Sequence, residues 1–228
     1  MITAALDCSQ GCSLAVRRDQ TLLCSETLPG SGRESDRTLS PWLKSCCQNL
    51  KLEVTDVERW SAGTGPGSFA GLRCGIALLK GICRAGTAKL RGIPSCYALA
   101  RSVTTPQPGQ TIGVLHDGRC GQVILTRFLI TENLDATWQT DPCPLFPEEL
   151  LEACHFCKRW ISLSSLQLPQ LPPEVQCNLQ QENSLNAKYL LDAEEQWPWP
   201  DNPLDQENSC QPLYVRQAVF VKPSPMRT

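Results

Sequence analysis

Residues 63–73 read Gly63-Thr-Gly-Pro-Gly-Ser-Phe-Ala-Gly-Leu-Arg73, and they decide the fold of this chain. The stretch stands between an extended segment and a helical one. Glycine permits positive φ and close backbone approach, and proline fixes φ and removes one donor. A turn this sharp, placed just before a helix, exposes free backbone N–H groups at the helix start. The stretch therefore either receives a ligand or partner, or joins a strand very tightly to a helix.

The helix after this turn has a clear start and an apolar side. Ser68 is well placed as its N-cap, and the helix is expected from Phe69 to about Arg84. Glycine inside a helix costs about 1 kcal/mol relative to alanine, so Gly71 and Gly75, spaced by four, indicate that something packs tightly there. We expect them to flatten a strip for close approach by another helix or a partner. The expected apolar side consists of Leu72, Ile76, Leu79 and Cys83.

The turn does not match three well-known catalytic or phosphate-binding loops. No Gly-Lys-Ser/Thr follows it, as a Walker A loop requires. The third glycine and the downstream acid of the dinucleotide fingerprint are missing. A nucleophile elbow at Ser68 would need glycine where Pro66 stands. The sequence therefore favours a structural or binding turn, formed by Gly63, Gly65, Pro66, Gly67 and Ser68.

Elements on both sides of the turn indicate an α/β fold. Apolar runs before it predict a three-stranded antiparallel meander and one helix, and runs after it predict another strand and helix. The order β-β-β-α-β-α-β-α resembles half of an actin-like or ribonuclease-H-like architecture. The expected strands are 2–7, 12–18, 20–27, the segment just before the turn, and 88–94; the expected helices are 35–50, with Leu39 and Leu43 in its apolar stripe, and 95–103.

The second half is expected to form a smaller lobe. Residues 104–109, Thr-Thr-Pro-Gln-Pro-Gly, are a composition break, so we expect lobes at 1–105 and 106–228, with the tail from about 210 docking back on the first. Residues 140–209 are proline-rich and polar, so their helices and strands are hard to predict from the sequence. Strands are expected at 111–115 and 122–130, helices near 147–153 and 185–195, and loop packing at Trp197-Pro-Trp-Pro200.

Composition limits the classes of function. The chain has 228 residues with 21 basic and 23 acidic side chains, which argues against binding nucleic acid alone through a broad basic surface. It does not exclude acting on nucleic acid within a complex. No apolar run is long enough for a membrane span, and the N-terminus does not resemble a signal peptide. We therefore expect a cytoplasmic protein.

Fourteen cysteines are unusual for such a chain, and we expect them to be mostly reduced thiols that pack as small hydrophobes. The spacing Cys154-His-Phe-Cys157 is the one that suggests a metal. A structural zinc site usually needs a second such pair, and none follows. Coincidence is favoured over metal binding, although a zinc-dependent module built on these two thiols remains an alternative.

Catalytic residues are not evident. Asp7, at the end of the first strand, is either a turn residue or an acid placed like the metal-side acid of actin-like ATPases. Asp117 and Arg119 are consistent with a plain Asx turn. The two histidines, His116 and His155, form no metal-ligand motif and no evident catalytic set. The sequence favours a partner or scaffold role, with no cofactor and no metal, over an independent enzyme.

Four motifs give a more specific indication. Gly63–Arg73 resembles the G-x-GPGSFTGLR hallmark of the TsaB family, the bacterial tRNA threonylcarbamoyladenosine biosynthesis proteins. Leu6-Asp-Cys-Ser9 resembles the family's early Asp-Thr-Ser, and Asp117-Gly-Arg-Cys-Gly-Gln-Val123 its Asp-Ala-Arg-x-x-Glu-Val hairpin. Pro212-Leu-Tyr-Val-Arg216 resembles its Pro-x-Tyr-Leu-Arg. The matches occur in family order over nearly the whole chain, and the first is by far the most specific.

Four residues depart from the family pattern. The chain has Cys8 and Ala70 in place of threonine, and Gln122 in place of glutamate. Glu34-Ser35 stands where the family commonly has His-Ser. These departures bear on contacts with partners more than on the fold.

The resemblance implies a two-lobed actin-like (ASKHA, ribonuclease-H-like) fold with mixed β-sheets flanked by helices. It also implies a non-catalytic subunit that supports a TsaD-like catalytic subunit, together with a TsaE-like ATPase. That complex transfers threonylcarbamoyl to the adenosine next to the anticodon, and tRNA would be met only through it. Asp7 and Ser9 would be the remnant of a nucleotide site, and the partner face would include Gly71, Gly75, Leu72, Leu39 and Leu43.

The alternative is an autonomous actin-like ATPase or small-molecule kinase, in which Asp7 and the glycine-rich turn bind metal and nucleotide. The sequence leaves open whether the free protein forms a homodimer and whether nucleotide binds between subunits. As a subunit, the chain would be required for a threonylcarbamoyltransferase without activity of its own.

Overall fold

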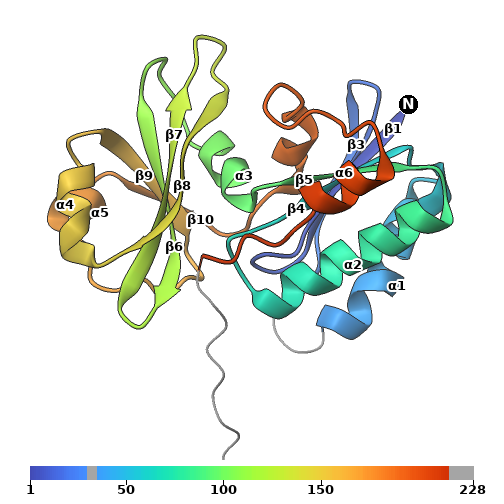
Figure 1. Cartoon of the computed structure of the whole chain (residues 1–228), viewed down its shortest axis with the longest axis horizontal. Coiled ribbons are helices and arrows are strands. Elements are labelled where there is room, and N and C mark those ends of the chain that lie inside the picture. The colour runs from blue at the N-terminus through green and yellow to red at the C-terminus, as the bar shows by residue number, and fades with distance from the viewer. Residues whose placement is uncertain (30–34, 216–228) are drawn as a thin grey trace, which may run out of the picture.

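The computed structural model describes residues 1–29 and 35–215. Two five-stranded mixed sheets stand side by side, with helices outside and between them (Figure 1). The predicted α/β fold with two mixed sheets flanked by helices is confirmed. Glu34 and Arg216, which belong to the compared motifs, lie outside the described residues.

The first sheet has the order β3-β2-β1-β4-β5. Its first three strands form the predicted antiparallel meander, while β4 and β5 run parallel to β1. The helices α1 and α2 connect β3 to β4 and β4 to β5, as parallel strands require a crossover. The elements are β1 (Ile2–Asp7), β2 (Ser13–Arg18), β3 (Thr21–Thr27), α1 (Ser35–Asn49), η1 (Val54–Asp56), β4 (Arg59–Gly63), α2 (Phe69–Ala85), β5 (Lys89–Ile93) and α3 (Ser95–Arg101).

The second sheet repeats this arrangement, with the order β8-β7-β6-β9-β10. Again three antiparallel strands are followed by two strands parallel to the first of them. The chain therefore uses one topology twice, although its sequence contains no visible repeat. The elements are β6 (Thr111–Arg119), β7 (Gln122–Ile130), β8 (Ala136–Leu145), η2 (Pro147–Glu149), α4 (Leu150–Ala153), β9 (Cys157–Leu163), α5 (Pro173–Gln176) and β10 (Leu179–Glu182).

Three apolar clusters hold these layers together. One lies between α1, α2 and the first sheet, a second between the two sheets around α3, and a third between the second sheet and α4 and α5. Strand β1 shows why one strand serves two clusters. Ala4 and Leu6 belong to the first cluster and Ala5 to the second, because successive side chains of a strand point to opposite faces.

After β10 the chain returns to the first sheet. The 3₁₀ helix η3 (Ala187–Asp192) packs against β1, β2 and β4, and α6 (Pro203–Ser209) packs against β5. The prediction of a helix near 185–195 is met by η3, while β8, β9, β10 and α6 were not predicted. Their sequences carry little regular alternation, and β8 includes two prolines, which are typical of edge strands.

The described residues bear on two further expectations, one about the cysteines and one about membrane-spanning helices. All fourteen cysteines lie in this part of the chain, and none of them is paired in a disulfide. Within residues 1–29 and 35–215, no helix combines the length and apolarity needed to cross a membrane.

Candidate functional site: the closed glycine-rich turn

The glycine-rich turn lies directly beside the end of β1. Asp7 is only 1% exposed. Its Oδ1 accepts hydrogen bonds from the Ser9 amide N–H at 2.8 Å and the Ser9 hydroxyl at 2.6 Å, and its Oδ2 accepts one from the Ser95 hydroxyl. Burial raises the pKa of the Asp7 carboxyl, while the bonds from Ser9 and Ser95 act in the opposite direction. The structure thus brings the two residues of the expected nucleotide-site remnant together.

Ser95 connects this carboxylate to the turn. Its hydroxyl oxygen accepts a hydrogen bond from the Gly65 N–H at 2.9 Å, and its own N–H donates to the Gly65 carbonyl at 2.7 Å. The Gly65–Pro66 peptide bond is cis. Sequence reasoning missed Ser95. The available signal was its place: it follows Pro94 at the end of β5, beside the ends of the parallel strands β1 and β4.

Two glycines of the turn lie close to the end of β1 and to the residues that follow it. An added Cβ at Gly63 would stand 1.7 Å from Asp7 Oδ2, and one at Gly67 would stand 2.3 Å from the Ser9 carbonyl oxygen. Gly65 has φ +103°, in the region that side chains rarely adopt. Gly63 and Gly67 therefore permit close contact between the turn and residues 7–9, while Gly65 lies beside Leu72.

The free N–H groups expected at the start of α2 are used in part by the protein itself. The Ser68 N–H donates to the Ser9 carbonyl at 2.6 Å. The Ser68 hydroxyl accepts from the Gly71 N–H at 3.2 Å, which confirms Ser68 as the N-cap. Both carboxylate oxygens of Asp7 also accept hydrogen bonds from the protein. The turn is therefore a closely packed connection between β4 and α2.

Four of the five residues expected at a partner face are buried instead. Leu39 and Leu43 are 2% exposed and Leu72 is 1% exposed, and all three pack inward, as does Gly75. A Cβ on Gly75 would lie 2.7 Å from Cys8 Sγ, and a Cβ on the partly exposed Gly71 would lie 2.3 Å from the Cys8 carbonyl oxygen. The expected flat strip is therefore corrected: it faces β1, because α2 must sit close to the first sheet.

The C-terminal motif covers the turn from outside. The Leu213 N–H donates to the Thr64 carbonyl at 2.8 Å. Arg73 Nε donates to the Tyr214 hydroxyl at 2.8 Å, and the Tyr214 ring lies 5.0 Å from the Phe69 ring, centroid to centroid. The first and last motifs of the sequence thus meet in space.

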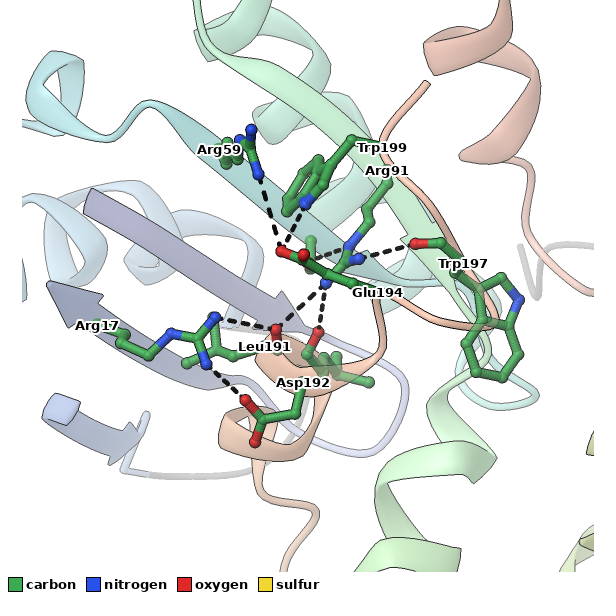
Figure 2. Close-up of polar contacts among 10 residues, drawn as sticks. Arg17, Arg59, Arg91, Leu191, Asp192, Glu194, Trp197 and Trp199 are labelled. Atoms are coloured by element: carbon green, nitrogen blue, oxygen red, sulfur yellow. Dashed lines mark hydrogen bonds and ion pairs between the residues drawn. The ribbon is translucent and has the colours of Figure 1, made fainter. Parts of the chain in front are cut away.

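A second polar cluster, which sequence reasoning missed, fixes the returning segment on the first sheet. Arg91, 1% exposed, donates to the Ser61 hydroxyl at 3.0 Å and to the carbonyls of Leu190, Leu191 and Trp197 at 3.2, 3.3 and 2.7 Å (Figure 2). Burial lowers the pKa of Arg91 to about 10. The available signal was a charged residue in the middle of the short strand β5, next to buried apolar residues.

Two more arginines, from other strands of the first sheet, support this cluster. Arg17 pairs with Asp192, and Arg59 lies 3.8 Å from Glu194, which also accepts from the Trp199 indole N–H at 2.8 Å (Figure 2). The Arg91 guanidinium stands 4.1 Å from the centroid of the Trp199 ring. Trp197 packs against the Tyr97 ring at 5.0 Å, centroid to centroid, so the Trp-Pro-Trp-Pro stretch serves packing.

The structure does not bring the remaining candidate residues from the sequence together in one site. His116 is buried on β6, and His155 is exposed beyond α4. Asp117 accepts from the Arg119 N–H at 2.8 Å, which is the predicted Asx turn. Cys154 is half-buried and Cys157 buried, and the described residues contain no group of three or more His, Cys, Asp or Glu side chains that could hold a metal ion.

Comparisons with family models and known proteins indicate which proteins this chain resembles. Residues 30–142 match the family model described as "TsaD: tRNA N6-adenosine threonylcarbamoyltransferase". A curated relative, the tRNA threonylcarbamoyladenosine biosynthesis protein TsaB of Escherichia coli (strain K12), is 25% identical over 126 residues, which are 55% of this chain and 53% of the relative. The chain thus spans about half the length of that relative in the alignment.

Two solved structures from Pseudomonas aeruginosa have the same fold. An uncharacterized protein with similarity to peptidase YEAZ matches with a TM-score of 0.72 at 19% identity, covering 94% of this chain and 99% of that one. YeaZ matches with a TM-score of 0.70 at 20% identity, covering 93% and 99%. YeaZ is another designation of TsaB. The predicted resemblance is therefore confirmed: this chain is similar in sequence to a TsaB protein over about half of its length, and it shares the fold of the two YeaZ-like structures over nearly all of it.

Proposed function

We propose that this chain is a non-catalytic subunit of a complex that makes threonylcarbamoyladenosine in tRNA, where it supports a TsaD-like catalytic subunit. The carrying observation is the closed turn: both oxygens of Asp7 accept hydrogen bonds from Ser9 and Ser95. In an actin-like ATPase this position would hold the metal-bound nucleotide. Here the carboxylate fixes the protein's own backbone, which supports a partner role over an autonomous ATPase or kinase.

We place the partner face on the outward sides of α1 and α2. On α2 the exposed positions recur at helical spacing, at Phe69, Arg73, Ala77, Gly81 and Arg84. Ala77 and Gly81 are small, so a partner helix can approach closely there. A TsaE-like ATPase and tRNA would join through the assembled complex, which would operate in the cytoplasm; a homodimer through this same face would be the free form.

Reconstitution tests the function directly. Threonylcarbamoyl transfer to tRNA is measured with the cognate TsaD-like and TsaE-like proteins, with and without this chain. We expect at least tenfold more product when the chain is present. Equal product without it would refute the proposal, and ATP hydrolysis by the isolated chain would favour the alternative enzyme.

A pair of matched variants tests the face. Ala77→Glu adds a charge to the outward side of α2, and Ser165→Glu adds the same charge to an exposed loop of the second lobe. We expect Ala77→Glu to weaken capture of the TsaD-like protein at least tenfold, because a helix interface has no room for a solvated carboxylate. Ser165→Glu should leave capture unchanged. Equal capture by both variants would place the face elsewhere.

A further inference from the structure

The turn between β1 and β2 contains two cysteines that stand opposite each other. The two strands are paired up to Asp7 and Ser13, so Cys8 and Cys12 are the first residues beyond the ladder on either side. They are 4% and 5% exposed and belong to the same apolar cluster. The two thiols interact, since Cys12 raises the pKa of the Cys8 thiol. Gly11, with φ +86° and open space around it, completes the turn.

This arrangement suits a disulfide. Directly opposed residues of an antiparallel pair have Cα atoms about 4.5–5.5 Å apart. Disulfides join residues whose Cα atoms are about 4.4–6.8 Å apart. Since Cys8 and Cys12 continue the pairing of Asp7 with Ser13 by one position and share one apolar cluster, a movement of the turn can bring the sulfurs to bonding distance.

We propose that Cys8 and Cys12 form a reversible disulfide that controls how closely α2 packs on β1. The oxidant is a small-molecule disulfide such as glutathione disulfide. The thiolate of one cysteine attacks it, which forms a mixed disulfide and releases one small thiol. The thiolate of the other cysteine then attacks the protein sulfur, which forms the Cys8–Cys12 bond and releases the second small thiol. The protein loses two protons and two electrons, and the small disulfide is reduced by two electrons.

Contacts of Cys8 connect this chemistry to α2. Its sulfur occupies the space that a Cβ at Gly75 would enter, and its carbonyl does the same at Gly71. The carbonyl of the next residue, Ser9, accepts a hydrogen bond from the N–H of Ser68, the N-cap of α2. When the Cys8 sulfur moves toward Cys12, it leaves the surface of α2, and that helix loses a buried contact.

Reaction in the native protein is expected to be slow. The hydrogen bond with Cys12 and burial raise the pKa of Cys8 well above its ordinary value, with the nearby Cys12, Asp7 and Cys74 acting in the same direction. Little thiolate is therefore present near neutral pH. The disulfide should form over hours, as the turn opens and closes.

Mass spectrometry of one tryptic peptide tests the bond. The full chain is equilibrated with glutathione buffers of increasing disulfide content, blocked with an alkylating agent in denaturant, and digested. Peptide 1–17 contains Cys8 and Cys12 and no other cysteine, so the bond appears as a loss of two hydrogens with no alkylation. Peptide 45–51 is the internal control, because its buried Cys46 and Cys47 are neighbours on a helix and point in different directions. It should remain reduced.

Amide exchange tests the coupling. After oxidation, residues 69–85 should exchange roughly tenfold faster than the same residues of Cys12→Ser protein treated identically. Reduction with dithiothreitol should restore the slow rate. The proposal is overturned if peptide 1–17 is alkylated twice or carries separate glutathiones at every ratio, if its disulfide appears only in unfolded protein, or if exchange over 69–85 is unchanged.

Discussion

Asp7 and Arg91 are both buried charges of the first lobe, each 1% exposed, but they are stabilised in different ways. Asp7 is bonded by a turn of its own strand and by Ser95 at the end of β5. Arg91 is bonded largely by carbonyls about a hundred residues later, including that of Trp197. The first charge closes a strand–turn–helix joint within the lobe, and the second fixes a returning segment onto its sheet.

The two buried charges therefore have different structural roles. Asp7 lies in a closely packed turn, and Arg91 attaches a distant segment to the sheet. Around Asp7 the backbone approaches so closely that only glycine fits, so substitutions should act through steric overlap. Around Arg91 the side chain supplies the donors, so substitutions should act through unpaired carbonyls.

Gly63→Ala should have the largest effect. The new Cβ would stand 1.7 Å from Asp7 Oδ2, with both groups buried, so the cost should exceed the usual range of about 1–3 kcal/mol for overpacked cores. Chemical denaturation measures it. Gly81→Ala is the matched control, because it has open space and lies inside α2, and it should stabilise the protein by about 0.5–1 kcal/mol. Similar effects of the two changes would contradict the interpretation that Gly63 is required for close packing against Asp7.

Arg91→Met should cost about 3 kcal/mol, because it leaves the carbonyls of Leu190, Leu191 and Trp197 without their donor. Arg91→Lys should recover little of this, since one ammonium group cannot reach all of these acceptors. Thermal unfolding and proteolysis near Trp197 report the loss. Full rescue by lysine would show that charge alone suffices.

His116 has neither a local nor a distant partner: within the described residues both ring nitrogens are buried without a hydrogen bond. Burial lowers the pKa of His116 to about 4, from the ordinary 6.5. The folded state therefore binds fewer protons than the unfolded state, so stability falls as pH drops through 6.5 toward 4. That shift corresponds to a loss of between about 2 and 3 kcal/mol at pH 4. His116→Leu should remove this part of the acid sensitivity, as measured by denaturation at pH 7 and pH 4; identical pH profiles would contradict the prediction.

Asp7→Asn should have the smallest effect. The amide oxygen can still accept from Ser9, and the amide nitrogen can face Ser95, so stability should change by about 1 kcal/mol or less. Support of tRNA modification in the reconstituted system should be retained. A loss of modification with an intact fold would instead indicate that the charge of Asp7 acts on a metal or nucleotide.

Much of the first lobe could be predicted from the sequence because its signals are local. The apolar runs, the N-cap at Ser68 and the glycine-rich turn each act over a few residues, and the corresponding elements are present within one or two residues of the expected bounds. The strands β8, β9 and β10 were missed because long-range pairing, rather than local propensity, forms them.

In the candidate site, too, some residues could be predicted from the sequence and others could not. The sequence located Asp7, Ser9 and the turn, but not Ser95, which is adjacent to Asp7 only because β5 lies beside β4 in the sheet. It also placed Gly71 and Gly75 on an outward strip, where the structure turns them toward Cys8. Periodicity shows that a helix has two faces, but not which face meets the sheet when small residues occupy one of them.

The fold class, the order of elements in the first lobe and the family resemblance could all be predicted from the amino-acid sequence, because hydrophobic periodicity and glycine geometry act locally. The tertiary structure was needed to show that the protein's own groups close the turn at Gly63–Arg73. It also decided that Arg91 clamps a segment a hundred residues away, and that Cys8 and Cys12 face each other in the core. These outcomes depend on which distant groups share one buried space, where each polar atom must find a partner and each glycine leaves room for something else.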